Sequence, residues 1–146
     1  SAASDVYKRQ GLAFHRHNSE IDQELKIKTG KKVKFQFTPH LSPMFRGILT
    51  TMYLDLKRND SLKKIYSFLK KYYKNHKFIK ILKPNTFLGT NEVINTNNCY
   101  ISVCESKYKN KIIILSAIDN LIKGGSGQAV QNMNILFGYK SDEGLN

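Results

Sequence analysis

The run HRHNSEIDQEL (residues 15–25) places two imidazoles on either side of Arg16 and just ahead of a carboxylate. A histidine can take up and return protons near neutral pH, and a nearby carboxylate can orient its ring. His15 and His17 are therefore candidates for an acid/base residue, with Glu20 as the orienting group. The alternative is that both are ordinary surface histidines at a helix start, and the pattern alone does not choose between the two rings.

A second run, FTPHLSPMFRGI (residues 37–48), packs two prolines, His40 and Arg46 into the link between two predicted strands. Links of this kind carry function disproportionately. The guanidinium of Arg46 can fork onto a carboxylate or a phosphate. A rigid turn with an exposed arginine is the alternative interpretation.

The third run, KGGSGQAVQNMN (residues 123–134), places three glycines before a predicted helix. Glycines let the backbone approach a ligand, and the free N–H groups of a helix start favour anions. The run is neither a Walker loop nor a GxGxxG fingerprint after a strand. Local chemistry therefore supports a contact surface, or else a glycine-broken helix packed closely against its neighbours.

Positive charge dominates the composition, with a net charge of +13. Residues 57–80 hold nine Lys/Arg and one Asp, so this segment supplies +8 of the total. The simpler interpretation is a solvated, lysine-rich helix face. Binding of nucleic acid is the alternative, but it needs aromatic or arginine side chains aimed outward beside the lysines. The predicted helix places its tyrosines on the apolar side, which argues against nucleic acid as a partner.

Two cysteines, Cys99 and Cys104, lie in one predicted strand. Their odd separation places the two thiols on opposite faces of the sheet, so they should not pair with each other. We interpret both as structural thiols and predict no metal site.

The hydrophobic periods predict an α+β fold rather than a doubly wound one, because strands and helices do not alternate strictly. Short links favour antiparallel neighbours. The first helix should be capped by Asn18 or Ser19 and stopped by Gly30, and the second should be capped by Asp60 or Ser61. Its apolar face should comprise Leu62, Ile65, Tyr66, Leu69, Tyr72 and Tyr73. The remaining expected elements are strands at 33–38, 48–56, 78–82, 98–105 and 111–118, and a glycine-interrupted helix from Asp119 through Phe137 that Gly138 ends.

Taken together, these runs resemble the N-acetyl-gamma-glutamyl-phosphate reductase family from about His15 to Gly138. The most specific stretch is SAIDNLIKGGSGQAVQNMNILFG (residues 116–138), and HRH followed by Glu20 and TPHLSPMFRG are also typical. Ser19 departs from the family, which usually has proline there. The resemblance implies an α+β domain like the C-terminal catalytic domain of glyceraldehyde-3-phosphate dehydrogenase, with a mostly antiparallel or mixed sheet and helices on one face.

The resemblance also implies a function. The family members are cytoplasmic oxidoreductases of arginine biosynthesis that reduce N-acetyl-glutamyl 5-phosphate to N-acetyl-glutamate 5-semialdehyde with NADPH and release phosphate. A homo-oligomer is expected as well. The implied site comprises His15 or His17 with Glu20 for catalysis, Arg16, His40 and Arg46 for the substrate, and Gly127, Gln128 and Asn132 for the NADP cofactor.

For domain organisation, we expect residues 1–10 to be a non-native extension and residues 139–146 to be a tail. Residues 11–138 should form a catalytic and oligomerisation domain whose last helix returns to the cofactor domain. The family's Rossmann half and its Gly-Cys-Tyr-Pro-Thr nucleophile segment do not occur in these 146 residues, so we expect the chain alone to be inactive. The alternatives are a non-catalytic assembly domain and the basic nucleic-acid module. No apolar run approaches the ~20 residues of a membrane span.

Overall fold

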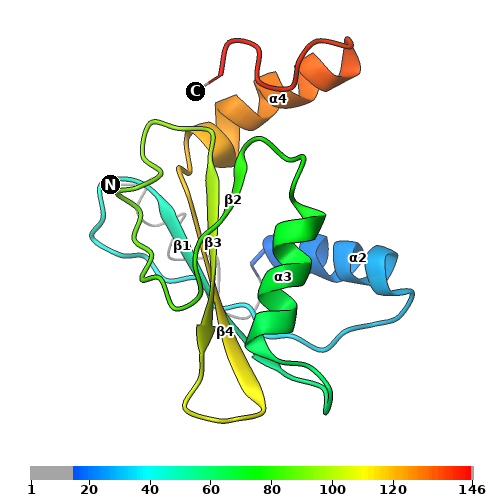
Figure 1. Ribbon diagram of the computed structural model, residues 1–146. Helices are drawn as coiled ribbons and strands as arrows, with labels where there is room; N and C mark the ends of the chain where they lie inside the picture. The colour runs from blue at the N-terminus through cyan, green and yellow to red at the C-terminus, as the bar shows by residue number, and fades with distance from the viewer. Residues whose placement is uncertain (1–14, 146) are drawn as a thin grey trace. The chain divides into compact units, whose positions relative to one another are not determined.

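The computed structural model describes residues 15–145 of the protein (Figure 1). The expected non-native extension at residues 1–10 lies outside the described residues and stays a prediction. The chain divides into two compact units, residues 1–43 and residues 44–146, which are described separately below.

The first unit contains helix α2 (His17–Thr29). Gly30 ends it with a left-handed φ of 70°, as the sequence predicts, and its N–H donates to the carbonyl of Lys26. The predicted N-cap is wrong, because Arg16 occupies that position. The chain already turns at His15, whose carbonyl accepts the N–H of Asn18, and the hydroxyl of Ser19 instead donates back to the carbonyl of Arg16 at 2.8 Å.

The predicted strand at 33–38 is also wrong, since these residues form no strand in the structure. The expected alternation is also incomplete, because Val33 and Phe37 are half-buried but Phe35 is exposed. A strand requires a neighbour that pairs with its N–H and C=O groups. The segment has none among the described residues, so it remains irregular.

The second unit is built on a sheet of β1 (Ile48–Asp55), β2 (Ile79–Ile81), β3 (Cys99–Glu105) and β4 (Lys111–Ile118), in the order β1-β4-β3-β2. β4 pairs antiparallel with both β1 and β3, whereas β2 and β3 are parallel. A parallel pair needs a connection of about a dozen residues or more, and the segment 82–98 provides it. The predicted α+β class with a mixed sheet is confirmed.

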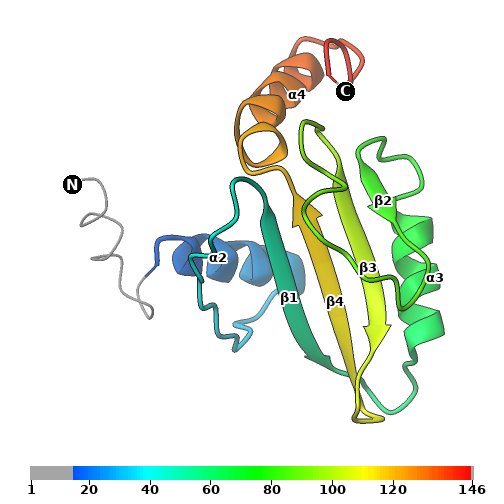
Figure 2. The same ribbon diagram turned by 90° about the vertical axis from the view of Figure 1, so that its left-hand side faces the viewer.

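Helix α3 (Leu62–Tyr72) lies against β2 and β3 on one face of the sheet (Figures 1 and 2). The predicted cap is confirmed, because the Ser61 hydroxyl accepts the N–H of Lys64 at 3.2 Å. The prediction for Tyr72 is wrong. This side chain is 58% exposed rather than on the apolar side, because the helical period places it one turn beyond Phe68 on the outer flank. The half-buried side chains are those of Leu62, Ile65, Tyr66, Leu69 and Tyr73.

The connection between β2 and β3 closes a small apolar core. Leu88 and Val93 from this connection pack with Ala117 of β4, and Leu82, Tyr100 and Leu115 surround them. Cys99 and Cys104 are both free thiols, and alternation along β3 directs them to opposite faces of the sheet as predicted.

Beyond the end of the sheet, the chain forms a π-helical turn, η1 (Ile122–Ser126), and then helix α4 (Gly127–Leu136) (Figure 1). Gly138 follows with a left-handed φ of 74°, which agrees with the predicted stop. Among the described helices of the second unit, α3 lies over a face of the sheet, whereas α4 extends past its end (Figure 2). Among residues 15–145, no helix is long and apolar enough to cross a membrane.

Candidate functional site

The two predicted catalytic histidines lie in contact at the start of α2. Their ring centroids are 4.6 Å apart in an edge-on arrangement, and Phe37 lies 5.5 Å from His15 and 6.1 Å from His17. The N–H of His17 donates to Nδ1 of His15 at 3.2 Å. This bond fixes the His15 ring and leaves its Nε2 as the nitrogen open to chemistry. We call His15, His17, Glu20 and Phe37 the histidine turn.

Glu20 faces His17 rather than His15. Its Oε2 lies 3.9 Å from Nε2 of His17, and the two side chains are 66% and 52% exposed. That distance is too long for a hydrogen bond. The sequence pattern leaves the two histidines equal, whereas the structure brings the orienting carboxylate to His17. The other predicted residues of this unit, Arg16 and His40, are both exposed.

The first unit also has an open groove of about 740 Å³ beside the start of α2. Its lining comprises Asn18, Asp22 and residues 32–38. Phe37 links this groove to the histidine turn, because its ring contacts both imidazoles.

In the second unit, Arg46 meets a carboxylate that the sequence reasoning missed. Its Nε lies 2.9 Å from Oδ1 and 2.8 Å from Oδ2 of Asp119. Arg46 is 18% exposed and Asp119 is fully buried. A buried carboxylate is tolerated only when it is paired and hydrogen-bonded. Three backbone N–H groups complete its shell: Asn95 donates to Oδ2, and Leu121 and Ile122 donate to Oδ1.

These contacts explain the ionisation of Asp119. Burial alone would raise the pKa of this carboxyl group, because a dry environment penalises the charged form. The hydrogen bond from Arg46 and those from Asn95, Leu121 and Ile122 outweigh burial and lower the pKa of Asp119 to about 2. The ion pair is thus charged at any physiological pH.

Gly47 adds a second tie at the same place. Its N–H donates to Oδ1 of Asn120 at 2.6 Å, and its φ of 107° suits glycine. A Cβ there would lie 2.6 Å from Cβ of Thr90. We call Arg46, Gly47, Asn95, Asp119 and Asn120 the aspartate cluster. It joins the entry of β1 to the turn after β4.

The glycine-rich run is held by a polar chain. Nδ2 of Asn97 donates to Oε1 of Gln131 at 3.2 Å, and Nζ of Lys123 donates to the same oxygen at 2.7 Å. A Cβ on Gly127 would lie 2.5 Å from Oδ1 of the fully buried Asn97 and 2.6 Å from Cγ2 of Ile122. Close packing therefore accounts for the glycine at this position.

The predicted cofactor residues lie together at the start of α4. Gly127 is buried and lines a cavity of about 230 Å³ with Asn95, Ile122, Ser126, Val130, Gly144 and Leu145. Nε2 of Gln128 donates to Oδ1 of Asn132 at 2.8 Å, so the two amides form a pair on the outer side of the helix. Their assignment to a cofactor stays a prediction. Among residues 15–145, no group of three or more His, Cys, Asp or Glu is placed to hold a metal ion.

Sequence reasoning missed Asp119, Asn97, Gln131 and Lys123. The only local signal was the Asp119-Asn120 pair after a buried strand, a position where side chains often bond to the backbone of a turn. Nothing local could pair Arg46 with Asp119, because the partners are 73 residues apart.

The fold and this arrangement define an α+β domain that combines an exposed acid/base candidate with a sheet whose edge strand is apolar. The sequence matches the semialdehyde dehydrogenase dimerisation domain over residues 1–120, and the chain belongs to that family.

Its relatives carry a more specific name. The N-acetyl-gamma-glutamyl-phosphate reductase of Thermoanaerobacter pseudethanolicus is 48% identical over 138 residues, which cover 94% of this chain and 40% of the relative. The protein of that name from Vesicomyosocius okutanii is 50% identical over 131 residues, 90% of this chain and 36% of the relative. The one from Desulforamulus reducens is 41% identical over 145 residues, 99% and 42% respectively. The chain thus spans about 40% of the length of these relatives, and the predicted resemblance is confirmed.

Proposed function

We propose that this chain is the C-terminal part of an N-acetyl-gamma-glutamyl-phosphate reductase, a cytoplasmic enzyme that reduces N-acetyl-glutamyl 5-phosphate to the 5-semialdehyde with NADPH and releases phosphate. One observation carries the proposal: the chain is 48% identical over 94% of its length to a protein of that name. The histidine turn supports it, because the reaction needs a group that takes and returns a proton near neutral pH.

His17 is the acid/base residue in this proposal. Its imidazole takes the proton of an attacking cysteine thiol and later returns a proton to the cysteine sulfur, when that sulfur leaves the carbon that becomes the aldehyde. Glu20, at 3.9 Å, stabilises the imidazolium that exists between these two steps. The cysteine comes from elsewhere in a longer protein, because Cys99 and Cys104 lie within the paired strand β3.

Three side chains, those of Arg16, His40 and Arg46, bind the substrate in this proposal. Arg16 and His40 are exposed, so their side chains can meet an acyl phosphate. Arg46 differs, because Asp119 holds its Nε and fixes the direction of the guanidinium. A guanidinium carries five N–H donors. In this proposal its terminal NH2 groups donate to a carboxylate or phosphate of the substrate.

The start of α4 fits the nicotinamide end of NADP. Gly127 lines the cavity there, and the amides of Gln128 and Asn132 offer donors and acceptors to a carboxamide. When bound, the cofactor supplies the hydride. The chain's own contribution is to orient that group next to the substrate.

The test begins with the gene. We expect the reading frame upstream of Gly11 to encode a Rossmann domain and a Gly-Cys-Tyr-Pro-Thr segment. The protein expressed from that frame should reduce NADP in the presence of the semialdehyde and phosphate, and residues 1–146 alone should not. Turnover by residues 1–146 alone would show that the nucleophile lies within them, and an inactive longer protein would contradict the proposed function.

The family description also supports a homodimer. Strand β1 is the edge strand of the sheet and carries exposed apolar side chains on both faces: Ile48, Leu49, Met52, Tyr53 and Leu54. Apolar area of this kind marks an interface. Light scattering should report a dimer, and Met52→Lys with Leu54→Lys should shift it to monomer. A strict monomer at high concentration would contradict this assembly.

A further inference from the structure

Helix α3 and the turn that follows it carry a row of exposed aromatic rings. Phe68, Tyr72 and His76 recur every four residues, and all three are exposed. The centroids of Phe68 and Tyr72 are 5.8 Å apart with planes 24° from parallel, and those of Tyr72 and His76 are 6.3 Å apart at 12°. We call these three residues the ring ladder. The ladder is one continuous stack along the outer flank of the helix.

A fourth ring, that of Tyr73, packs against the ring ladder. The half-buried Tyr73 meets Tyr72 edge-on at 4.9 Å and His76 at 5.4 Å. Burial raises the pKa of Tyr73, so its hydroxyl stays neutral. The outer rings are therefore held in place while Phe68 remains 60% exposed and Tyr72 58% exposed.

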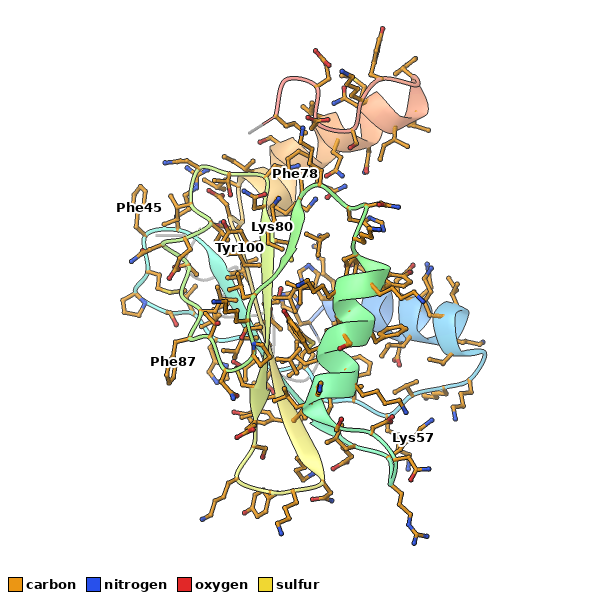
Figure 3. The ribbon with its side chains drawn as sticks, viewed as in Figure 1. Phe45, Lys57, Phe78, Lys80, Phe87 and Tyr100 are labelled. Carbon is orange, nitrogen blue, oxygen red and sulfur yellow. The ribbon has the colours of Figure 1, made fainter. Side chains whose placement is uncertain are left out.

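Lysines border the ladder. Lys64 lies four residues before Phe68 and Lys71 lies three residues after it, so both share the flank of the helix that carries Phe68. Lys74 follows just after the C-terminal end of α3. The segment from Lys57 to Lys80 has a net charge of +8. Figure 3 shows Lys57 in the loop that precedes α3 and Lys80 on β2, so part of this charge lies outside the helix.

The chemistry of this surface selects its partner. A second copy of the chain would bring the same +8 segment to the interface, which like-charge repulsion disfavours. An acidic protein would provide carboxylates to pair with the lysines, but its carboxylates would not stack on the aromatic rings. Single-stranded nucleic acid satisfies both features, because phosphates pair with lysines while bases stack on aromatic faces.

We propose that the ring ladder of α3 and the lysines beside it form a binding platform for single-stranded nucleic acid. The outward direction of Phe68 and Tyr72 carries this inference, since aromatic side chains beside the lysines are the condition that such a platform requires. Base-independent stacking means that the platform accepts any sequence.

The test measures fluorescence anisotropy of a labelled thymidylate oligonucleotide, about 15 nucleotides long to span such a site, with the full chain. We expect salt-sensitive binding, and inorganic polyphosphate, which has the charge but no bases, should compete poorly. The double substitution Phe68→Ala with Tyr72→Ala should weaken oligonucleotide binding by about tenfold or more and leave polyphosphate binding unchanged. Lys71→Gln should instead weaken both polyanions and reduce the slope of log K against log salt by about 0.7.

Tyr108 provides the matched control. It is also 60% exposed and lies between Lys107 and Lys109, but it stands alone in the turn between β3 and β4. Tyr108→Ala should leave oligonucleotide binding unchanged. The proposal is overturned if Tyr108→Ala and the double substitution have equal effects, or if polyphosphate displaces the oligonucleotide as well as unlabelled thymidylate does. His76→Ala, which lies outside the helix, tests the ladder independently should the double substitution disturb folding.

Discussion

The histidine turn and the aspartate cluster both place charged groups close together, yet they differ in nearly every physical respect. In the histidine turn the imidazole and carboxylate are half or more exposed and 3.9 Å apart. In the aspartate cluster the carboxylate is fully buried and its partner is 2.8 Å away. The first arrangement leaves atoms free to react, whereas the second commits both carboxylate oxygens to structure. Accessibility therefore separates the proposed catalytic groups from the structural ion pair in this chain.

The largest expected effect concerns catalysis. In the longer reductase proposed above, His17→Gln should lower kcat by about 10²–10⁴-fold, because it removes the proton carrier. His15→Gln should have a smaller effect, since Nδ1 of His15 serves the backbone N–H of His17. Steady-state assays of the two variants decide between the rings. Both should retain the unfolding free energy of the parent within about 0.5 kcal/mol. A greater loss in His15→Gln would reverse the assignment.

The next effect concerns the aspartate cluster, where a substitution should lower the stability of the fold. Asp119→Ala leaves the Arg46 guanidinium and three buried N–H groups without their hydrogen-bond acceptor. The substitution should therefore lower the free energy of unfolding by about 3–5 kcal/mol. Urea titration measures it. Asp55→Asn is the control, because Asp55 pairs with Lys111 while 75% exposed, and it should cost no more than about 1 kcal/mol. Equal costs at the two sites would show that burial does not distinguish them.

Acid should weaken the aspartate cluster in a defined pH range. The pKa of Asp119 is about 2 in the folded chain against an ordinary 3.8 for an unperturbed aspartate, so folding favours the ionised form. Its contribution, about 2 kcal/mol, is complete above pH ~4 and is lost as the pH falls toward ~2. Denaturation curves from neutral pH down to that range should show this loss. In Arg46→Met the folded pKa should lie nearer the ordinary value, so the loss should be smaller and should end at a higher pH. An unchanged profile in that variant would refute the ion pair as its main cause.

The smallest effect concerns the glycine-rich run. Gly127→Ala should cost about 1–3 kcal/mol, because the new Cβ meets Asn97 and Ile122 at 2.5–2.6 Å. Gly124→Ala is the matched control, since its Cβ would meet Ile118 at an ordinary 3.4 Å. In the double variant Gly127→Ala with Asn97→Ala, the loss of stability should be smaller than the sum of the two single losses. Strictly additive losses in thermal melts would show that the contact between residues 97 and 127 is absent.

Local features were predictable from sequence where local chemistry decides them. The Gly30 and Gly138 stops, the Ser61 cap and the limits of β4 follow from backbone preferences within a few residues. The strand at 33–38 failed because pairing depends on a distant neighbour. Tyr72 failed because the buried stripe of α3 is narrower than the spacing of its apolar residues suggests. Arg46 was singled out as a substrate-binding residue, and that role stays a prediction. Its buried partner Asp119 lies 73 residues away, where no local pattern records it.

The edge strand β1 has a consequence for the life of the chain before it is fully assembled. It presents unpaired backbone groups along one side together with exposed apolar side chains, without the prolines or bulges that usually protect such edges. In newly made chains, correct pairing of β1 therefore competes with aggregation. Aggregation becomes faster as the concentration of these chains rises. Slow synthesis at low temperature should give more soluble protein than rapid synthesis in the warm.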